Sequence, residues 1–502
     1  MKMFFRYGYL SILVSMLVVQ VLLVYFQSNI PRGSDQFWYI VDSESVAENN
    51  FTTNNVFPNS RKDDGDSLRP FVQNRPIVYL AGYLVKMGLS PVEAYKIINV
   101  FSYFLIIILL FFSLRNYKTS VNSSIIAISV FVSSPLIIFS IYNPLTNLFD
   151  ASLFSAFVFS LFILFERKLK ALGFSLCAIT GAISFSLLIL QRSDFLMYLW
   201  GTLGVFSYMG LKMRSKSIRQ VLFLIAFFIF VHYINVAGNY FPSHLAGDVP
   251  THSIFLTGVD GYFHNMIAFF GRNSDFNHLN ISEIVIEKVI VFFKSLFEPL
   301  NFLALWNLFV IFAVLVYKRL VKQKIESMEV LFGVLVLFNL AVLIGFQFQY
   351  RYSVFLIAPS VYIVFNNYSI FQHYHINRYL MPIVLILFVT VNYFVFRIVA
   401  KESNESYIFD TQVKDFNIAS NSKAAVVYNG GSSLIWSWLL KDISEVHYFL
   451  PNEMRNLTIG EFDLEVHCDS IYRFDCDEHD ERRIYKVGEY YVQLSKKEEF
   501  QN

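Results

Sequence analysis

Carboxylate and guanidinium side chains stand at the ends of apolar segments in widely separated parts of this sequence. A carboxylate can take a proton from an attacking hydroxyl or amine group. An arginine can hold two phosphate oxygens at once and stabilise a departing phosphate. These residue types suit the transfer of a group from a lipid phosphate to an acceptor. The candidate residues are Asp35, Glu44, Arg75, Asp150, Arg192 and Arg351.

The composition indicates that a membrane positions these residues. Of 502 residues, 55% are hydrophobic and 18% aromatic, whereas only 16% are charged. A soluble chain this apolar would expose large adhesive patches, so an integral membrane protein is predicted. The formal charge of +2 is near neutral and argues against a nucleic-acid partner.

Apolar segments long enough to span the hydrocarbon core predict about eleven transmembrane helices. The first follows Lys2 and Arg6, and no small-residue cleavage site comes after it. A retained signal anchor is therefore expected. The predicted spans are residues 8–26, 95–114, 122–141, 149–165, 171–190, 195–211, 221–238, 300–317, 329–346, 352–366 and 379–397.

The distribution of Lys and Arg predicts the orientation. If the N-terminus is cytoplasmic, the inner loops carry basic clusters, whereas the short outer turns hold little beyond Arg192 and Arg351. The positive-inside rule then places the N-terminus inside and the C-terminus outside the cell (plasma) membrane. The inner clusters are Arg115 and Lys118; Arg167, Lys168 and Lys170; Lys212, Arg214, Lys216 and Arg219; Lys318, Arg319, Lys322 and Lys324; and Arg378.

This topology divides the chain into two predicted domains. Residues 1–397 form a mainly α, polytopic membrane domain with outer loops at 27–94 and 239–299. Apolar stretches at 74–90 and 281–299 are expected to form helices that lie along the membrane interface.

Residues 398–502 form the second predicted domain, a small exported α/β domain. Within it, "SKAAVVYNGGSSLIWSWLLKDISEVHYFL" predicts strand, Gly-Gly turn, short helix and strand, and "EYYVQLSK" predicts a further strand. Cys468 and Cys476 lie close together here, and either a disulfide or two free thiols is compatible with the sequence.

Three sequence blocks resemble one family of enzymes. "SDQFWYIVDSE" places Asp35 before aromatic residues, and "NRPIVYLAGYLVKMGLS" places Arg75 before an interfacial helix and a Gly-hydrophobic-Ser turn. "SSPLIIFSIYNPLTNLFDASLF" places Asp150 after a proline. These blocks resemble the GT-C class of membrane glycosyltransferases, especially the branch with protein O-mannosyltransferases and lipid A aminoarabinose transferases. The resemblance covers about the first 200 residues.

The resemblance implies an inverting transfer of a sugar from a polyprenyl-phosphate donor to a glycan, lipid or protein acceptor at the outer face of the membrane. Asp35 would be the general base, and Arg75 with Arg351 or Arg192 would hold the lipid phosphate. Many relatives carry Asp-Glu at the first block, whereas Gln36 follows Asp35 here. A second carboxylate would then be Asp42, Glu44 or Asp150. The Trp-Trp-Asp-Tyr-Gly signature of oligosaccharyltransferases is absent from the sequence, which disfavours transfer of a whole oligosaccharide to asparagine.

Other readings stay open. A cell-envelope polysaccharide polymerase or ligase would also use rim arginines and polyprenyl-linked sugars. A lipid-linked sugar flippase or transporter is disfavoured, because its charges would lie near the bilayer midplane in repeated halves. No cofactor is predicted with certainty. A divalent metal is left open, since Asp150 could help bind one, whereas His244, His252, His264 and His278 follow no zinc-binding spacing.

Overall fold

The structure is a computed structural model of the 502-residue chain. It describes residues 2–26, parts of 39–48, 56–58, 68–70, 76–116, 119–142, 147–166, 171–191, single helical residues between 286 and 309, parts of 312–345, 350–367, 377–415 and five strands between 423 and 496. The chain forms two compact units. Unit 1 comprises Met1–Tyr25, Arg75–Ile77 and Ile98–Tyr393, and unit 2 comprises Phe26–Asn74, Val78–Ile97 and Phe394–Asn502.

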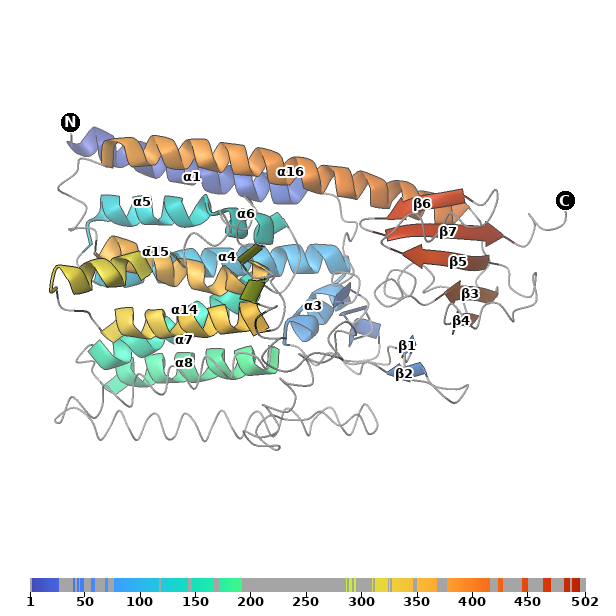
Figure 1. Ribbon diagram of the computed structural model, residues 1–502, viewed down its shortest axis with the longest axis horizontal. Coiled ribbons are helices and arrows are strands. Elements are labelled where there is room, and N and C mark those ends of the chain that lie inside the picture. Colours follow the sequence, from blue (N-terminus) through green and yellow to red (C-terminus); the bar gives the residue numbers. More distant parts are fainter. Residues whose placement is uncertain are drawn as a thin grey trace. The chain divides into compact units, whose positions relative to one another are not determined.

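Helices build unit 1 (Figure 1). The helices α3 (Pro76–Lys86), α4 (Pro91–Asn116) and α16 (Asn377–Asp415) each contribute two or more residues to both units. The other helical elements are α1 (Lys2–Phe26), α5 (Val121–Val132), α6 (Pro135–Tyr142), α7 (Asn147–Glu166), α8 (Ala171–Gln191), α14 (Ser327–Gly345), the 3-10 helix η2 (Tyr350–Leu356) and α15 (Ile357–Asn366).

Several helices have the length and composition that a membrane requires. Within the described residues, three are long and apolar enough to cross a bilayer: Gly8–Phe26, Pro91–Arg115 and Leu380–Ile398. The pair α5 and α6 makes a fourth if the two form one span. A mainly helical chain with several apolar helices is therefore confirmed, whereas eleven spans and the orientation stay predictions. The predicted spans at 195–211 and 221–238 lie outside the described residues.

The span predicted at 122–141 is not one straight helix. It consists of α5 and α6, which are bent by 59° at Ser133 and Ser134. Pro135 causes the break, because its ring lacks an N–H group and clashes with a preceding helical turn. Such a break frees backbone carbonyls, and in an apolar bundle these need another donor. Gln20 supplies one, since its Nε2 donates to the Val132 carbonyl over 3.2 Å.

The helices α7 and α8 form an antiparallel pair (Figure 1). The Phe157 and Phe185 rings lie with centroids 4.5 Å apart. A Cβ atom added to Gly181 would lie 3.4 Å from Ser160 Cβ, an ordinary van der Waals distance, so these two positions face each other across the pair. These two contacts define the register of the pair, in which the start of α7 faces the end of α8.

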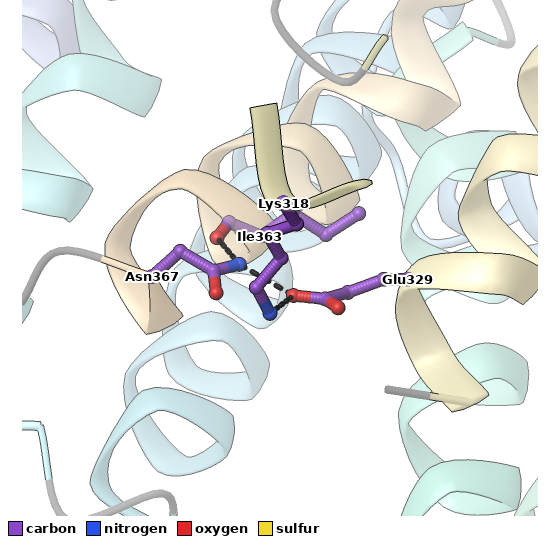
Figure 2. A network of polar contacts seen from close by, with 4 residues as sticks. All are labelled: Lys318, Glu329, Ile363 and Asn367. Atoms are coloured by element: carbon purple, nitrogen blue, oxygen red, sulfur yellow. Dashed lines mark hydrogen bonds and ion pairs between the residues drawn. The ribbon is translucent and has the colours of Figure 1, made fainter. Parts of the chain in front are cut away.

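A buried polar network joins α14, α15 and the helical residues around Lys318 (Figure 2). Lys318 Nζ donates to Glu329 Oε1 over 2.5 Å, and their side chains are 7% and 2% exposed. Asn367 Nδ2 donates to the same oxygen over 2.6 Å and to the Ile363 carbonyl over 2.9 Å. Lys318 is therefore neutralised inside the protein, while Arg319 and Lys322 of the same predicted inner cluster are exposed.

In unit 2, a glycine turn and a capping box connect α3 to α4. Gly88 has a φ of 100°, which residues with a Cβ atom rarely adopt. The α3 helix ends here with two backbone hydrogen bonds, from Gly88 N to the Val85 carbonyl (2.9 Å) and from Leu89 N to the Leu84 carbonyl (3.3 Å). Ser90 and Glu93 then cap α4 reciprocally. The Gly-hydrophobic-Ser motif of the sequence is thus the joint between the two helices.

Unit 2 also contains two sheets. A short antiparallel pair, β1 (Val56–Pro58) and β2 (Leu68–Pro70), lies in the long first loop. The tail forms a five-stranded mixed sheet in the order β4-β3-β5-β7-β6 (Figure 1). Its strands are β3 (Lys423–Val427), β4 (Glu445–Phe449), β5 (Leu464–Ser470), β6 (Arg483–Val487) and β7 (Tyr490–Lys496).

The sheet contains the three strands expected from the sequence, at β3, β4 and β7. The β3 and β4 strands pair in parallel, with Lys423 opposite Glu445 and Val427 opposite Phe449. The helix predicted between these strands lies outside the described residues. The α16 helix continues to Asp415, past the predicted domain boundary at 397. An exported location for residues 398–502 stays a prediction.

Candidate functional site

The first turn of α7 holds the one predicted site carboxylate of unit 1 that the structure describes. Asp150 is 2% exposed and lies three residues after the helix begins at Asn147. A negative charge is favoured here, because the backbone N–H groups at a helix start carry a partial positive charge. A carboxylate so deeply buried needs partners to remain ionised. Asp150 is therefore enclosed by the protein and is not exposed to solvent at the helix end.

The segment containing Arg351 packs against α7. Arg351 belongs to η2, and η2 contacts α6, α7, α14 and α15. Phe355 in η2 packs against Phe154 in α7, and their ring centroids are 4.7 Å apart. Phe154 lies one helical turn after Asp150. The structure thus brings the Arg351 segment beside the helix that holds Asp150, although the two are distant in the sequence.

A side-chain cap joins the start of α3 to the end of α8. Gln191 Oε1 accepts a hydrogen bond from the Ile77 backbone N–H over 3.2 Å. Both residues are buried, and 114 positions separate them in the sequence. Ile77 is the second residue of α3, after Pro76, so Gln191 satisfies one of the N–H groups that a helix start leaves unpaired.

Chain connectivity relates this cap to two predicted phosphate ligands. Arg75 is the next residue before α3, and Arg192 is the next after α8. Both lie outside the described residues. In the sequence, the Ile77–Gln191 bond therefore lies two positions from Arg75 and one position from Arg192.

The helix pair α7–α8 connects these features within unit 1. Its register pairs Phe157 with Phe185 and Ser160 with Gly181. Continued toward the start of α7, the same register pairs the turn of Asp150 with the end of α8 at Gln191. One end of unit 1 therefore combines the buried carboxylate, the Arg351 segment and the two helix ends that adjoin Arg75 and Arg192.

The remaining predicted residues fall elsewhere. Glu44 belongs to unit 2, where it is half-buried in a helical segment that packs on α3. Asp35 and Asp42 lie outside the described residues, and nothing in the structure tests the role of Asp35. Arg351 is placed by its backbone alone.

Sequence reasoning missed two neutral amides at this end of unit 1. Gln191 is 1% exposed and Asn147 is 7% exposed. In the part of the chain that the structure describes, Gln191 Nε2 and Asn147 Nδ2 have no hydrogen-bond partner. The candidates from the sequence were charged residues at the ends of apolar segments, and a neutral amide such as Gln191 does not meet this criterion. A polar residue that ends an otherwise apolar helix would have been the signal.

No metal centre is formed by the described residues, in which no group of three or more His, Cys, Asp or Glu side chains could hold an ion. The four histidines of the outer loop, His244, His252, His264 and His278, lie outside those residues. The side chains of Cys468 and Cys476 do so as well, and their disulfide stays an open prediction.

The fold resembles that of solved membrane glycosyltransferases. ArnT from Cupriavidus metallidurans bound to undecaprenyl phosphate aligns with a TM-score of 0.60 and 10% identity, over 97% of this chain and 98% of ArnT. The oligosaccharyltransferase AglB from Archaeoglobus fulgidus, in complex with an inhibitory peptide and a dolichol-phosphate, aligns with a TM-score of 0.52 and 13% identity.

The AglB alignment covers 87% of this chain and 64% of AglB, so the chain spans less than two thirds of that protein. No family model matches the sequence, and no curated protein matches it. At these identities the likeness concerns the fold. The resemblance to the GT-C class, inferred from three short sequence blocks, is confirmed at that level.

Proposed function

We propose that this protein is a membrane glycosyltransferase that transfers a sugar from a polyprenyl-phosphate donor to a glycan, lipid or protein acceptor at the outer face of the cell membrane. The observation that carries the proposal is the convergence of Asp150, the Arg351 segment and the Gln191–Ile77 cap at one end of unit 1. Its GT-C fold supports the same conclusion, because both neighbours have been solved with a polyprenyl-type phosphate.

The proposed reaction is a single displacement with inversion. The carboxylate of Asp35 takes the proton of the acceptor hydroxyl while the acceptor oxygen attacks the anomeric carbon of the sugar. The bond between that carbon and the phosphate oxygen breaks, and its electrons leave with the polyprenyl phosphate. Arg75, with Arg351 or Arg192, stabilises the negative charge that develops on this leaving group.

Asp150 has a binding role in this proposal. Carboxylates accept hydrogen bonds from hydroxyl groups, so Asp150 would orient the donor sugar through its hydroxyls. Its burial suits this role, because an acceptor in a dry site discriminates strongly between sugars that present a hydroxyl and those that do not. Glu44 remains the candidate for a second carboxylate in the first loop.

The test is transfer of radiolabelled sugar in membranes supplied with polyprenyl-phosphate sugars. Wild type and Asp35→Asn are compared at equal protein level, together with their binding of the lipid donor. Loss of transfer with donor binding retained supports Asp35 as the base. Unchanged transfer would remove Asp35 from the chemistry and assign the base to another carboxylate. Absence of transfer by the wild type with every donor would overturn the proposal in favour of a polysaccharide polymerase or a lipid-linked sugar flippase.

A further inference from the structure

The amide nitrogen of Gln191 is a buried hydrogen-bond donor for which the described part of the chain supplies no acceptor. The side chain is 1% exposed, and Nε2 has no partner among the residues that the structure describes. Leaving a buried donor unpaired is costly, so such groups in native proteins call for an explanation. One explanation is an acceptor that arrives with a ligand.

The orientation of this amide is determined by its other end. The Ile77 backbone N–H can donate only to the carboxamide oxygen, so Oε1 must face α3 and Nε2 must be the free donor. The nitrogen consequently lies at the start of α3, where the helix dipole provides a partial positive charge. The α3 helix has 11 residues and begins with Pro76, which has no backbone N–H group. The partial positive charge at its start therefore comes from the N–H groups that follow Pro76.

The surroundings indicate what kind of acceptor fits. Donor, helix start and the two arginines that adjoin it in the sequence, Arg75 and Arg192, all favour an anion such as a phosphate. The register of α7 and α8 adds the carboxylate of Asp150 to the same end of unit 1, and a carboxylate disfavours an isolated anion beside it. A ligand that joins a phosphate to hydroxyl groups satisfies both, because its hydroxyls can donate to Asp150.

We infer that Gln191 Nε2 donates a hydrogen bond to a phosphate oxygen of the lipid donor, while Gln191 Oε1 holds the start of α3 in place. This inference rests on the proposed function and adds a binding residue to it. The same carboxamide thereby links phosphate binding to the position of α3.

The experiment distinguishes the role of the Gln191 oxygen, which accepts from the Ile77 N–H, from the role of the Gln191 nitrogen, which is proposed to donate to the phosphate. Gln191→Glu keeps an oxygen for the Ile77 N–H and removes the donor, whereas Gln191→Met removes both. Polyprenyl phosphate binding is measured by titration into protein held in lipid nanodiscs, with polyprenol lacking phosphate as the second probe. Thermal unfolding without added lipid is measured in parallel.

Gln191→Glu is expected to bind polyprenyl phosphate about ten- to a hundredfold more weakly than wild type, because a bond to a charged acceptor is lost. A carboxylate at this buried position also lowers the unfolding temperature, so the loss of affinity is judged against Gln20→Glu, which carries the same buried charge. Gln191→Met should lose binding and also unfold at a lower temperature. Should Gln191→Glu fail to fold, the neutral Gln191→Met carries the binding test.

Gln20→Glu is the matched control. Gln20 is also fully buried, but its Nε2 already donates to the Val132 carbonyl inside the protein. The substitution should therefore lower stability and leave the affinity for polyprenyl phosphate unchanged.

Three outcomes would overturn the inference. If wild type binds polyprenyl phosphate and Gln191→Glu binds it equally well, Gln191 is not a phosphate ligand, and the proposed function stands. If polyprenol binds as tightly as polyprenyl phosphate, the phosphate is not recognised here. If wild type binds no polyprenyl phosphate at all, the proposed function fails together with the inference.

Discussion

The Phe154 and Phe355 rings meet edge to face, with centroids 4.7 Å apart and planes inclined by 66°. Both side chains are buried. Asp150 precedes Phe154 by one helical turn, and Arg351 precedes Phe355 by four residues. This contact therefore sets the spacing between the helix that carries a site carboxylate and the segment that carries a predicted phosphate ligand.

Phe355→Leu should reduce sugar transfer more than it reduces stability. The substitution removes an edge-to-face contact and leaves space in the core, which costs about 1–3 kcal/mol of unfolding free energy. It also lets η2 shift relative to α7, and small misplacements in a site lower rates strongly. Transfer rate and thermal unfolding are measured together. Phe332→Leu, at an equally buried ring that contacts Tyr362, is the control, and an equal loss of transfer there would refute the positioning role.

Breaking the Lys318–Glu329 pair on one side should destabilise the protein. Lys318→Met removes the positive partner of the buried Glu329 carboxylate, at a cost of about 3–5 kcal/mol. The double variant Lys318→Met/Glu329→Leu should recover most of this loss, because no buried charge remains. Thermal unfolding in detergent measures both. Arg319→Met, at an exposed neighbour, should change stability by less than about 0.5 kcal/mol. A double variant no more stable than the single one would contradict this account.

Gly82→Ala should displace the helical segment that carries Glu44. A Cβ atom at position 82 would lie 2.6 Å from Val46 Cγ1, well inside van der Waals contact, and 3.2 Å from the Ser43 carbonyl oxygen, which is a tight contact. Val46 is fully buried and cannot move away cheaply, so a cost of about 1–3 kcal/mol is expected. Adding Val46→Ala should restore part of the stability. Gly8→Ala, where nothing lies within 4 Å, should be neutral, and similar unfolding temperatures for the two alanine variants would exclude the clash.

Asp150→Asn should weaken use of the donor sugar. The amide preserves the shape of the buried side chain but loses the charge that the helix start favours and that accepts sugar hydroxyls. Losing one such charged hydrogen bond costs about 1.5–3 kcal/mol, or roughly ten- to a hundredfold in kcat/KM for the sugar donor. Binding of polyprenyl phosphate without sugar should change little. An equal loss for the sugar-free lipid would instead assign Asp150 a structural role.

Local sequence patterns predicted most of the helical elements. Apolar runs at 8–26, 149–165, 171–190 and 379–397 each correspond to a described helix, because a chain in lipid must satisfy its backbone hydrogen bonds within one helix. The strands β3, β4 and β7 were also predicted from their local sequences. The break in the span predicted at 122–141 was not anticipated, although Pro135 was visible in the sequence.

The sequence by itself determined the class of protein, its apolar elements and the residue types available for chemistry. Only the tertiary structure decided which of these meet. The hydrogen bond between Gln191 and Ile77 spans 114 positions, and the contact between Phe154 and Phe355 joins two elements with no local pattern in common. Local propensity depends on neighbours along the chain, whereas an amide cap or a ring contact depends on how helices pack. That is why Gln191 became a candidate only once the start of α3 was found beside the end of α8.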